Sequence, residues 1–386
     1  MFAPQPAQMS SPQNTALPTQ FAQRMSGLKS SPIREILSVL DRPGMISFAG
    51  GLPAPESFPP LDYASIPARA QQYGASEGEP ELRAQVVLEC AARGLKVDVS
   101  QVLILNGSQQ GLDLVAKLFL QAGTRIALED PSYLAALQVF RLFQADCVAL
   151  TEPAPLAYLI PNFQNPSSRC WTSDERTQFA ASADASAQIV FEDDPYRDLC
   201  YEQVNLQPVV SYLQRSLWVY QSSFSKSLCP GLRLGFLVAS PTLMPYLVRL
   251  KQAADLCSNR LSQFLVLEAL LHPRRATRLQ ELQSFYRQRR DLFQATLTQH
   301  FGQMAQWTQP SGGMFFWLKL KAAVDTRPLL SQAIAQNVAF MPGEYFFLRP
   351  EQARGYLRLN FSHSNDQQTQ QGLRTLAHII QAAMPL

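Results

Sequence analysis

The chain has 386 residues, of which 46% are hydrophobic and 16% charged, and its formal net charge is +3 at pH 7. That length is too great for one ordinary core, so we expect a globular protein with two domains, or with one large domain and a smaller appendage. The small charge, with no Lys/Arg run, argues against nucleic acid as a partner, and no apolar run approaches the roughly 18 to 20 residues of a membrane span.

The first 23 residues carry no charge and are rich in Pro, Gln, Ser and Ala. They lack the basic and apolar regions of a secretory signal, and we interpret residues 1–23 as a disordered tail. The cysteines are scattered and never fall in a CxxC spacing, which predicts reduced, mostly buried thiols and no metal site. These features predict a cytoplasmic protein. The six cysteines are Cys90, Cys147, Cys170, Cys200, Cys229 and Cys257.

Short apolar runs alternate with helix-like stretches over residues 47–241, which predicts a βαβ architecture around a mostly parallel sheet. The amphipathic pattern at 108–123 predicts a helix ended by Gly123. Another helix is predicted at 172–185, which opens with a capping box. Strands are predicted at 101–106, 124–130, 146–150, 156–161, 188–193, 217–222 and 232–239.

The pattern changes after residue 241. A long helical tract runs to about Thr298 with a break near "HPRR", and short strand-like pieces then alternate with helices, which is typical of an α+β module. We therefore predict an N-terminal segment at 24–45 that packs with the small domain, a large α/β domain at 46–265, and a small α+β domain at 266–386.

Polar residues follow several predicted strands, where ligands gather in open parallel sheets. Ser108 and Gln109 open a helix whose free N–H groups and dipole favour an anion such as phosphate, although Ser108 could simply cap its helix. "EDDPY" places Asp193 and Tyr196 at an apolar strand end. A buried carboxylate there needs a protonated heterocycle nitrogen, a metal or another donor; a solvated turn is the alternative. Two further strand-end residues are Asn165 in "NFQNPSS" and Tyr133 in "EDPSY".

The stretch "SSFSKSLCPGLRLGF" carries one lysine, Lys226, among small and apolar residues. Desolvation lowers the pKa of such an amine, and a neutral amine is a nucleophile toward a carbonyl. The hydroxyls of Ser223 and Ser225 and the guanidinium of Arg233 form a candidate anion clamp. An aldehyde that carries a phosphate would satisfy both halves, whereas a lysine in a surface loop is the alternative.

Ten motifs in order give the chain a family resemblance from about residue 30 to the end. They are "PIREIL", "SFAGGLPAPESFP", "QYGASEGEPELR", "NGSQQGLDL", "EDPSY", "NPSS", "EDDPY", "SFSKSLCPGLRLGF", "GGMFFWL" and "LRLNFS". The sequence resembles fold type I pyridoxal phosphate-dependent aminotransferases of class I/II, in particular the 2-aminoadipate and kynurenine aminotransferase group. The resemblance implies a large domain with a mostly parallel sheet between helices, a smaller α+β domain, and a homodimer. It also implies pyridoxal 5′-phosphate as cofactor and a ping-pong transfer between an amino acid and a 2-oxo acid.

The family's roles fall on matching positions of this sequence. Lys226 resembles the Schiff-base lysine and proton shuttle, and Asp193 resembles the partner of the pyridinium N–H. Asn165 and Tyr196 resemble the pair that hydrogen-bonds the ring O3′, and Tyr133 resembles the aromatic residue stacked on the ring. The residues that resemble the phosphate cup are Ser108, Gln109, Ser223, Ser225 and Arg233.

Further positions correspond to substrate and partner contacts in the family. Tyr73 corresponds to a tyrosine that reaches the phosphate of the neighbouring subunit, and Arg358 corresponds to the arginine that binds the substrate α-carboxylate. Gly50 and Gly51 would let the backbone approach the substrate, with Asn165 beside them. Arg34 resembles a position that in some members contacts an acidic substrate side chain. The aromatic residues Phe48, Tyr345 and Phe346 are candidates for an apolar substrate pocket.

Two features depart from the family pattern. "NPSSR" replaces the usual glycine of "NPTG", and only "TEPAP" separates two predicted strands where relatives place a helix. A parallel crossover usually needs about a dozen residues, so we expect the strand at 146–150 to be displaced or irregular. Two other functions stay open: another reaction of the same cofactor, such as that of a β-lyase or decarboxylase, and a non-catalytic sensor module. Substrates with 2-aminoadipate, glutamate, kynurenine, aromatic or branched side chains are all compatible with the sequence.

Overall fold

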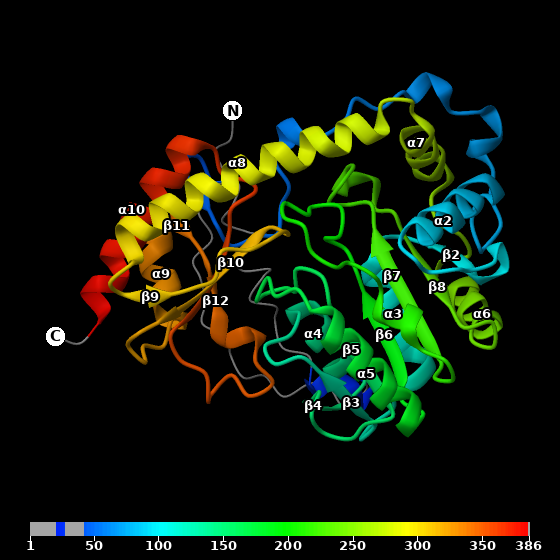
Figure 1. Cartoon of the computed structure of the whole chain (residues 1–386), viewed down its shortest axis with the longest axis horizontal. Coiled ribbons are helices and arrows are strands. Elements are labelled where there is room, and N and C mark those ends of the chain that lie inside the picture. Colours follow the sequence, from blue (N-terminus) through cyan, green and yellow to red (C-terminus); the bar gives the residue numbers. More distant parts are fainter. Residues whose placement is uncertain (1–20, 28–41, 385–386) are drawn as a thin grey trace.

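The structure is a computed structural model that describes residues 21–27 and 42–384. Most of the predicted tail at 1–23, much of the segment at 24–45, and Arg34 lie outside the described residues. Within them the chain forms two modules, each with its own sheet and core (Figure 1). Among the described helices, none is long and apolar enough to cross a membrane.

The large module is built on a seven-stranded sheet with the order β2-β8-β7-β6-β5-β3-β4. All neighbouring strands run parallel except β8, which is antiparallel to both β2 and β7. The prediction of a mostly parallel sheet is therefore confirmed. The strands are β2 (Val102–Leu105), β3 (Arg125–Leu128), β4 (Asp146–Ala149), β5 (Leu156–Leu159), β6 (Ile189–Asp193), β7 (Trp218–Ser223) and β8 (Gly235–Ala239).

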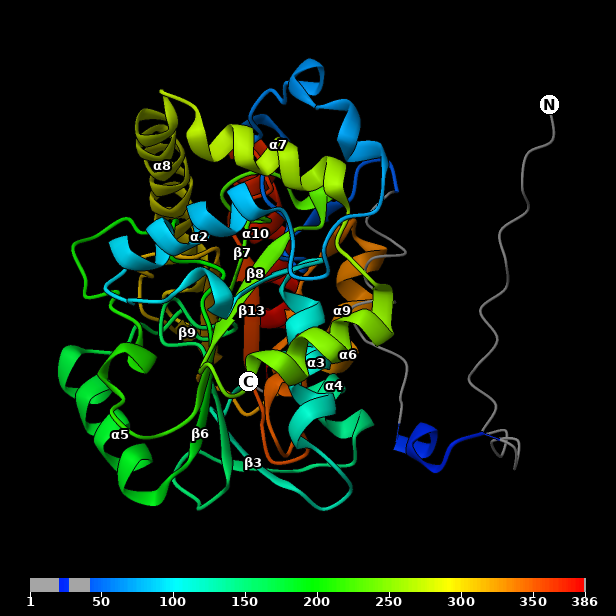
Figure 2. The same ribbon diagram turned by 90° about the vertical axis from the view of Figure 1, so that its right-hand side faces the viewer.

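Helices cover both faces of this sheet, because the strands are apolar on both sides. One face packs against α3 (Ser108–Phe119), α4 (Leu134–Leu142) and α6 (Met244–Asp255). The other face packs against α2 (Pro80–Ala92), α5 (Ser173–Ser186) and α7 (Arg260–Leu271). Figure 2 shows α5 on one side of the strands and α3, α4 and α6 on the other.

Two helix boundaries test the sequence rules. The capping box at the start of α5 forms as expected, with Thr172 and Glu175 each accepting from the other's backbone N–H. The predicted end of α3 at Gly123 is wrong, since the helix ends at Phe119. Leu120 takes an extended conformation and buries its side chain in the core, and Gly123, with φ +81°, makes the turn into β3 instead.

The expectation of a displaced or irregular strand at 146–150 is also wrong. β4 pairs with β3 in parallel over all four residues and forms the regular edge of the sheet. The connection 150–155 contains no helix, as the sequence indicated, and it leads to β5 on the other side of β3. So short a link suffices because each strand has four residues, which leaves only about 13 Å to return along the sheet. Arg125 fixes the link by donating to Glu152 and to Pro153 O, each at 2.8 Å.

The C-terminal module holds a four-stranded antiparallel sheet with the order β12-β13-β10-β9, and a parallel pair of β1 with β11. The long helix α8 spans from this module to α7 of the large module (Figure 1). The elements are β1 (Ile46–Ser47), α8 (Arg275–Phe301), β9 (Ala305–Gln306), β10 (Phe315–Leu320), α9 (Arg327–Ala335), β11 (Val338–Ala339), β12 (Met341–Pro342), β13 (Tyr356–Asn360) and α10 (Asp366–Ala383). The predicted α+β character after residue 241 is confirmed.

The division of the chain at residue 265 stays a prediction. Val266 and Leu270 of α7 belong to a core of the large module, whereas α8 contributes Phe293 to the core of the C-terminal module. Ile46 and Phe48 also lie in that second core.

The six cysteines are all free thiols. Our expectation that most are buried was wrong, because only Cys90 is buried and the other five are half-buried. Cys147 lies on the edge strand β4, and the remaining four lie in loops.

Candidate active site

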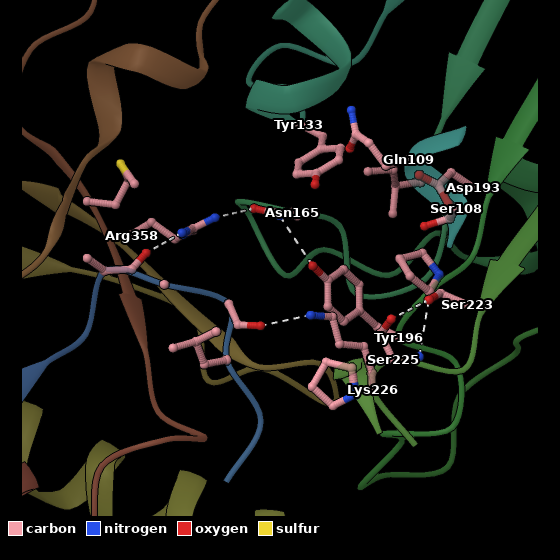
Figure 3. A pocket seen from close by; sticks show the side chains of 18 of the residues that line it. Ser108, Gln109, Tyr133, Asn165, Asp193, Tyr196, Ser223, Ser225, Lys226 and Arg358 are labelled. Carbon is pink, nitrogen blue, oxygen red and sulfur yellow. Dashed lines mark hydrogen bonds between the residues drawn. The ribbon is translucent and has the colours of Figure 1, made fainter. Parts of the chain in front are cut away.

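The carboxyl ends of β5, β6 and β7 and the start of α3 open into one cavity of about 410 Å³, which the C-terminal module closes (Figure 3). The predicted site residues that line it are Gly50, Gly51, Ser108, Gln109, Tyr133, Asn165, Asp193, Tyr196, Ser223, Ser225, Lys226, Arg233 and Arg358. Tyr73 and Arg34 are not among them. Tyr73 lies on the surface and is 77% exposed, and Arg34 lies outside the described residues.

Lys226 lies three residues beyond β7, and its Nζ donates a hydrogen bond to Gly51 O at 2.8 Å. Burial lowers the pKa of Lys226 from 10.5 to about 8, and the nearby guanidinium groups of Arg233 and Arg358 act in the same direction. A substantial fraction of this amine is therefore neutral near pH 8 and able to attack a carbonyl carbon.

The pH dependence of aldehyde addition tests this pKa. Only the neutral amine attacks, so the rate at which the cofactor-free protein adds a small aromatic aldehyde should rise with pH and reach half its maximum near pH 8. Stopped-flow absorbance between about pH 6 and pH 11 measures it. A midpoint near 10.5, the ordinary value for lysine, would contradict the described environment of Lys226.

Asp193 ends β6 with its carboxylate buried in the cavity wall. Tyr158 Oη on the neighbouring strand donates to Asp193 Oδ2 at 2.8 Å, and Oδ1 has no hydrogen-bond partner in the described part of the chain. Burial raises the pKa of Asp193 to about 7, and the polar side chains of Tyr158 and Gln221 oppose this. A buried acceptor without a partner costs about 1–3 kcal/mol. The free oxygen is therefore suited to a donor that a ligand supplies.

Asn165 joins the two modules across the cavity. Its Nδ2 donates to Tyr196 Oη at 3.2 Å, and its Oδ1 accepts from Arg358 Nη1 at 2.9 Å. Arg358 Nη2 donates to Ala49 O at 2.5 Å, and the guanidinium lies 4.3 Å from the ring centre of Phe315. Burial lowers the pKa of Arg358 to about 10, so the group is still a cation at neutral pH. Figure 3 shows Arg358 on the side of the cavity opposite Ser108 and Ser223.

The predicted phosphate cup depends on two close backbone approaches. Gly107, with φ +76°, precedes α3, and a Cβ there would lie 2.7 Å from Arg233 Nη2. A Cβ on Gly235 would lie 2.7 Å from Ser222 O and 3.1 Å from the backbone N of Ser108. Only glycine therefore lets β8 and Arg233 reach the first turn of α3. That turn presents free N–H groups beside a guanidinium, which is an anion site.

Part of the cavity lining was not predicted from the sequence, and three aromatic residues that were predicted to line it lie elsewhere. The missed lining residues are Ala49, Leu52, Ile160, Pro195, Pro230 and Met341. Phe48, Tyr345 and Phe346 do not line the cavity. Phe48 packs instead on Phe293 at 5.3 Å in the core of the C-terminal module, and Phe346 is fully buried beneath Arg358. Tyr158 was also missed, although a phenol inside an apolar strand signals a buried hydrogen-bond partner.

Comparison with known proteins gives one family across most of the chain. Residues 62–376 match the family model "Aminotransferase class I and II". The chain is 32% identical to "Aromatic-amino-acid aminotransferase 1" of Thermococcus litoralis, over 94% of each chain. The crystal structure of an alpha-aminoadipate aminotransferase from Thermus thermophilus, complexed with N-(5′-phosphopyridoxyl)-L-leucine, has a TM-score of 0.84 and 33% identity, covering 94% of this chain and 97% of that one. That of Pyrococcus horikoshii kynurenine aminotransferase has a TM-score of 0.87 and 28% identity, covering 95% and 98%.

Proposed function

Since this chain belongs to the class I and II aminotransferases and is a pyridoxal phosphate-dependent transaminase, we propose which residues perform the transfer and which substrates it takes. The amino group moves between an L-amino acid with an aromatic, acidic or branched side chain and a 2-oxo acid. One observation carries the residue assignment: a partly neutral lysine, a carboxylate with a free oxygen and a buried arginine face the same cavity.

The residues present fit pyridoxal phosphate at three separate points. The Lys226 amine matches the aldehyde, and the unpartnered Asp193 Oδ1 matches a protonated ring nitrogen. The turn at Gly107, with Arg233 against it, matches the phosphate. When bound, the cofactor supplies a protonated ring that withdraws electrons from the substrate Cα.

Each residue then has a defined task. The Lys226 amine would hold the cofactor through its aldehyde, and Nζ, when free, would accept the α-proton of the substrate. Asp193 keeps the ring nitrogen protonated, and Tyr158 orients that carboxylate through Oδ2. Tyr196 and Asn165 present hydroxyl and amide groups to the ring oxygen, and their mutual hydrogen bond fixes both side chains.

The substrate is held by groups from the other side of the cavity. Arg358 binds the α-carboxylate, because it is the cation on the cavity wall opposite the cup and is buried. Tyr133, which immediately precedes α4, lines the cavity and would contact the cofactor ring. Burial raises the pKa of Tyr133 to about 12, so its phenol stays protonated and can donate.

Replacing Arg358 by lysine separates binding from chemistry. Lysine cannot keep both the bond to Asn165 and a bidentate contact with a carboxylate. We expect KM for the amino acid to rise by about 10- to 100-fold while kcat falls far less. Steady-state kinetics with saturating 2-oxo acid measure both, with the surface variant Arg349→Lys as control. A loss confined to kcat would argue against carboxylate binding by Arg358.

The substrate class follows from the charges and the apolar residues of the lining. In the described part of the chain the cations of the cavity are Lys226, Arg233 and Arg358, and all three have assigned tasks. A side-chain carboxylate therefore needs a further cation, which we assign to Arg34. Apolar side chains of the substrate can pack against Leu52, Ile160 and Met341, which line the cavity. These two features together support a mixed substrate range.

A panel of amino donors with 2-oxoglutarate as acceptor tests this range in the wild type and in Arg34→Gln. We expect kcat/KM for 2-aminoadipate and glutamate to fall by about 10-fold or more in the variant, with leucine and aromatic donors changed by less than about 2-fold. Equal effects on all donors would contradict the role of Arg34. Turnover that proceeds without any oxo acid, with release of CO₂ or ammonia, would favour a decarboxylase or β-lyase.

Homodimer formation completes the proposed site. Tyr73 is exposed and does not line its own cavity, so we assign it to the cofactor phosphate of a second subunit. Tyr63, Leu256 and Leu261 are also exposed around α7, which suits an interface between two copies. Light scattering should give twice the mass of the chain.

We propose a cytoplasmic location because all six cysteines are free thiols, and cell fractionation tests this location.

A further inference from the structure

A buried lysine that the transamination chemistry does not use lies directly behind the phosphate cup. Lys251 on α6 has none of its side chain exposed, and its Nζ donates to Asp255 Oδ1 at 2.9 Å and to Gln110 Oε1 at 3.0 Å. Burial lowers its pKa, while Asp255 favours the charged form. Lys251 is buried and the side chain of Asp255 is 24% exposed, and ion pairs in such surroundings generally add little to stability. Its position is therefore better explained by what it holds in place.

The ion pair holds the junction between β2 and α3. Asp255 Oδ2 accepts from Gln110 Nε2 at 2.6 Å and from Asn106 Nδ2 at 2.5 Å. Gln110 Oε1 in turn accepts from the backbone N of Asn106 at 2.9 Å. Asn106 directly precedes Gly107, the residue that Arg233 approaches. Asp255 therefore fixes both ends of the turn that forms the phosphate cup.

The same set of contacts reaches the segment that carries Tyr73. Asn106 Oδ1 accepts from the backbone N of Asn259 at 3.4 Å, and Asn259 caps α7. The next residue, Arg260, forms an ion pair with Glu79 and donates to Tyr73 O at 3.2 Å. A continuous path of hydrogen bonds and one peptide link thus joins the cup of one subunit to the residue proposed to serve the other.

We propose that the Lys251–Asp255 pair is a positioning element for the cofactor phosphate, holding the Asn106–Ser108 turn where its N–H groups meet the phosphate oxygens. None of Asn106, Gln110, Lys251 and Asp255 lines the cavity, so the pair acts through the turn and not by contact. This inference rests on the proposed use of the cavity for pyridoxal phosphate. It predicts that loss of the pair weakens recognition of the phosphate and leaves the lysine chemistry intact.

The test compares two ligands that differ only in the phosphate. Cofactor-free protein is titrated with pyridoxal phosphate and with pyridoxal, and absorbance gives the two dissociation constants. The double variant Lys251→Met/Asp255→Leu removes both charges together, so no buried charge is left unpaired. We expect its affinity for pyridoxal phosphate to fall by about 10- to 100-fold and its affinity for pyridoxal to change by less than about 2-fold.

Two further variants keep the result interpretable. Gln110→Met breaks the contacts to the turn while it leaves the ion pair in place, and should reproduce the selective loss if the double variant fails to fold. Glu89→Leu/Arg275→Met removes a different, partly buried ion pair between α2 and α8 and should leave both affinities unchanged.

The possible results distinguish failure of the positioning role from failure of the proposed function. An unchanged ratio of the two affinities in the double variant or in Gln110→Met, including an equal loss for both ligands, would overturn the positioning role. A wild-type protein that binds neither ligand would instead overturn the proposed function of the cavity.

Discussion

Replacing Lys226 by alanine is expected to lower kcat/KM by more than about 10⁴-fold. The general base alone contributes roughly 10²- to 10⁴-fold in enzymes, and we propose that Lys226 also supplies the covalent link to the cofactor. Nζ is the amine that faces the cavity with a lowered pKa. The variant should therefore bind pyridoxal phosphate, if at all, only through the cup and Asp193.

Borohydride reduction followed by peptide mass mapping measures the link directly. In the wild type, the added mass should lie on the peptide that contains Lys226, and in the variant it should be absent. Lys321→Ala is the matched control, because that lysine is exposed on the C-terminal module. A Lys226→Ala protein with activity within about 10-fold of the wild type would refute the assignment.

Asp193→Asn is expected to give the second-largest loss, with kcat lowered by about 10²- to 10³-fold. The amide has almost the same shape, but it carries no charge and cannot hold a proton on the ring nitrogen. The unpartnered Oδ1 and the pKa raised by burial to about 7 indicate that the ionised form of Asp193 is disfavoured in the cofactor-free protein. A bound ring cation would bring that pKa down again.

Stability measurements distinguish this loss from simple misfolding. Because a buried carboxylate without a full set of partners is costly, cofactor-free Asp193→Asn should unfold at a denaturant concentration no lower than that of the wild type. Asp174→Asn, on the exposed first turn of α5, is the control for kinetics. Full kcat in Asp193→Asn would contradict the role of the charge.

The placement of the strand-end residues around one cavity was predictable because it depends on local sequence. Asp193 and Lys226 each follow an apolar strand, and parallel strands bring their carboxyl ends to one edge of a sheet. Gly107 and Ser108 likewise follow an apolar strand, and they indicate where α3 begins. These positions depend on a few neighbouring residues and on the alternation of strands and helices, which a single sequence displays.

Which side chains are buried and which line the cavity depends on packing between distant elements, which a single sequence does not display. Lys251 has the pattern of a solvated helix lysine, and its burial arises only where α6 packs against α3. Phe48 and Phe346 were predicted to line an apolar substrate pocket, yet both are fully buried in cores. Met341 lines the cavity only because a small-domain strand closes over it.

The most direct test of the central claim is a single half-reaction. Purified protein with bound cofactor is mixed with one amino donor and no oxo acid, while visible absorbance and the release of 2-oxo acid are followed. We expect the absorbance band of the bound cofactor to be lost, about one 2-oxo acid per site to be released, and the band to return when 2-oxoglutarate is added. An unchanged band, or continuous turnover without an oxo acid, would contradict it.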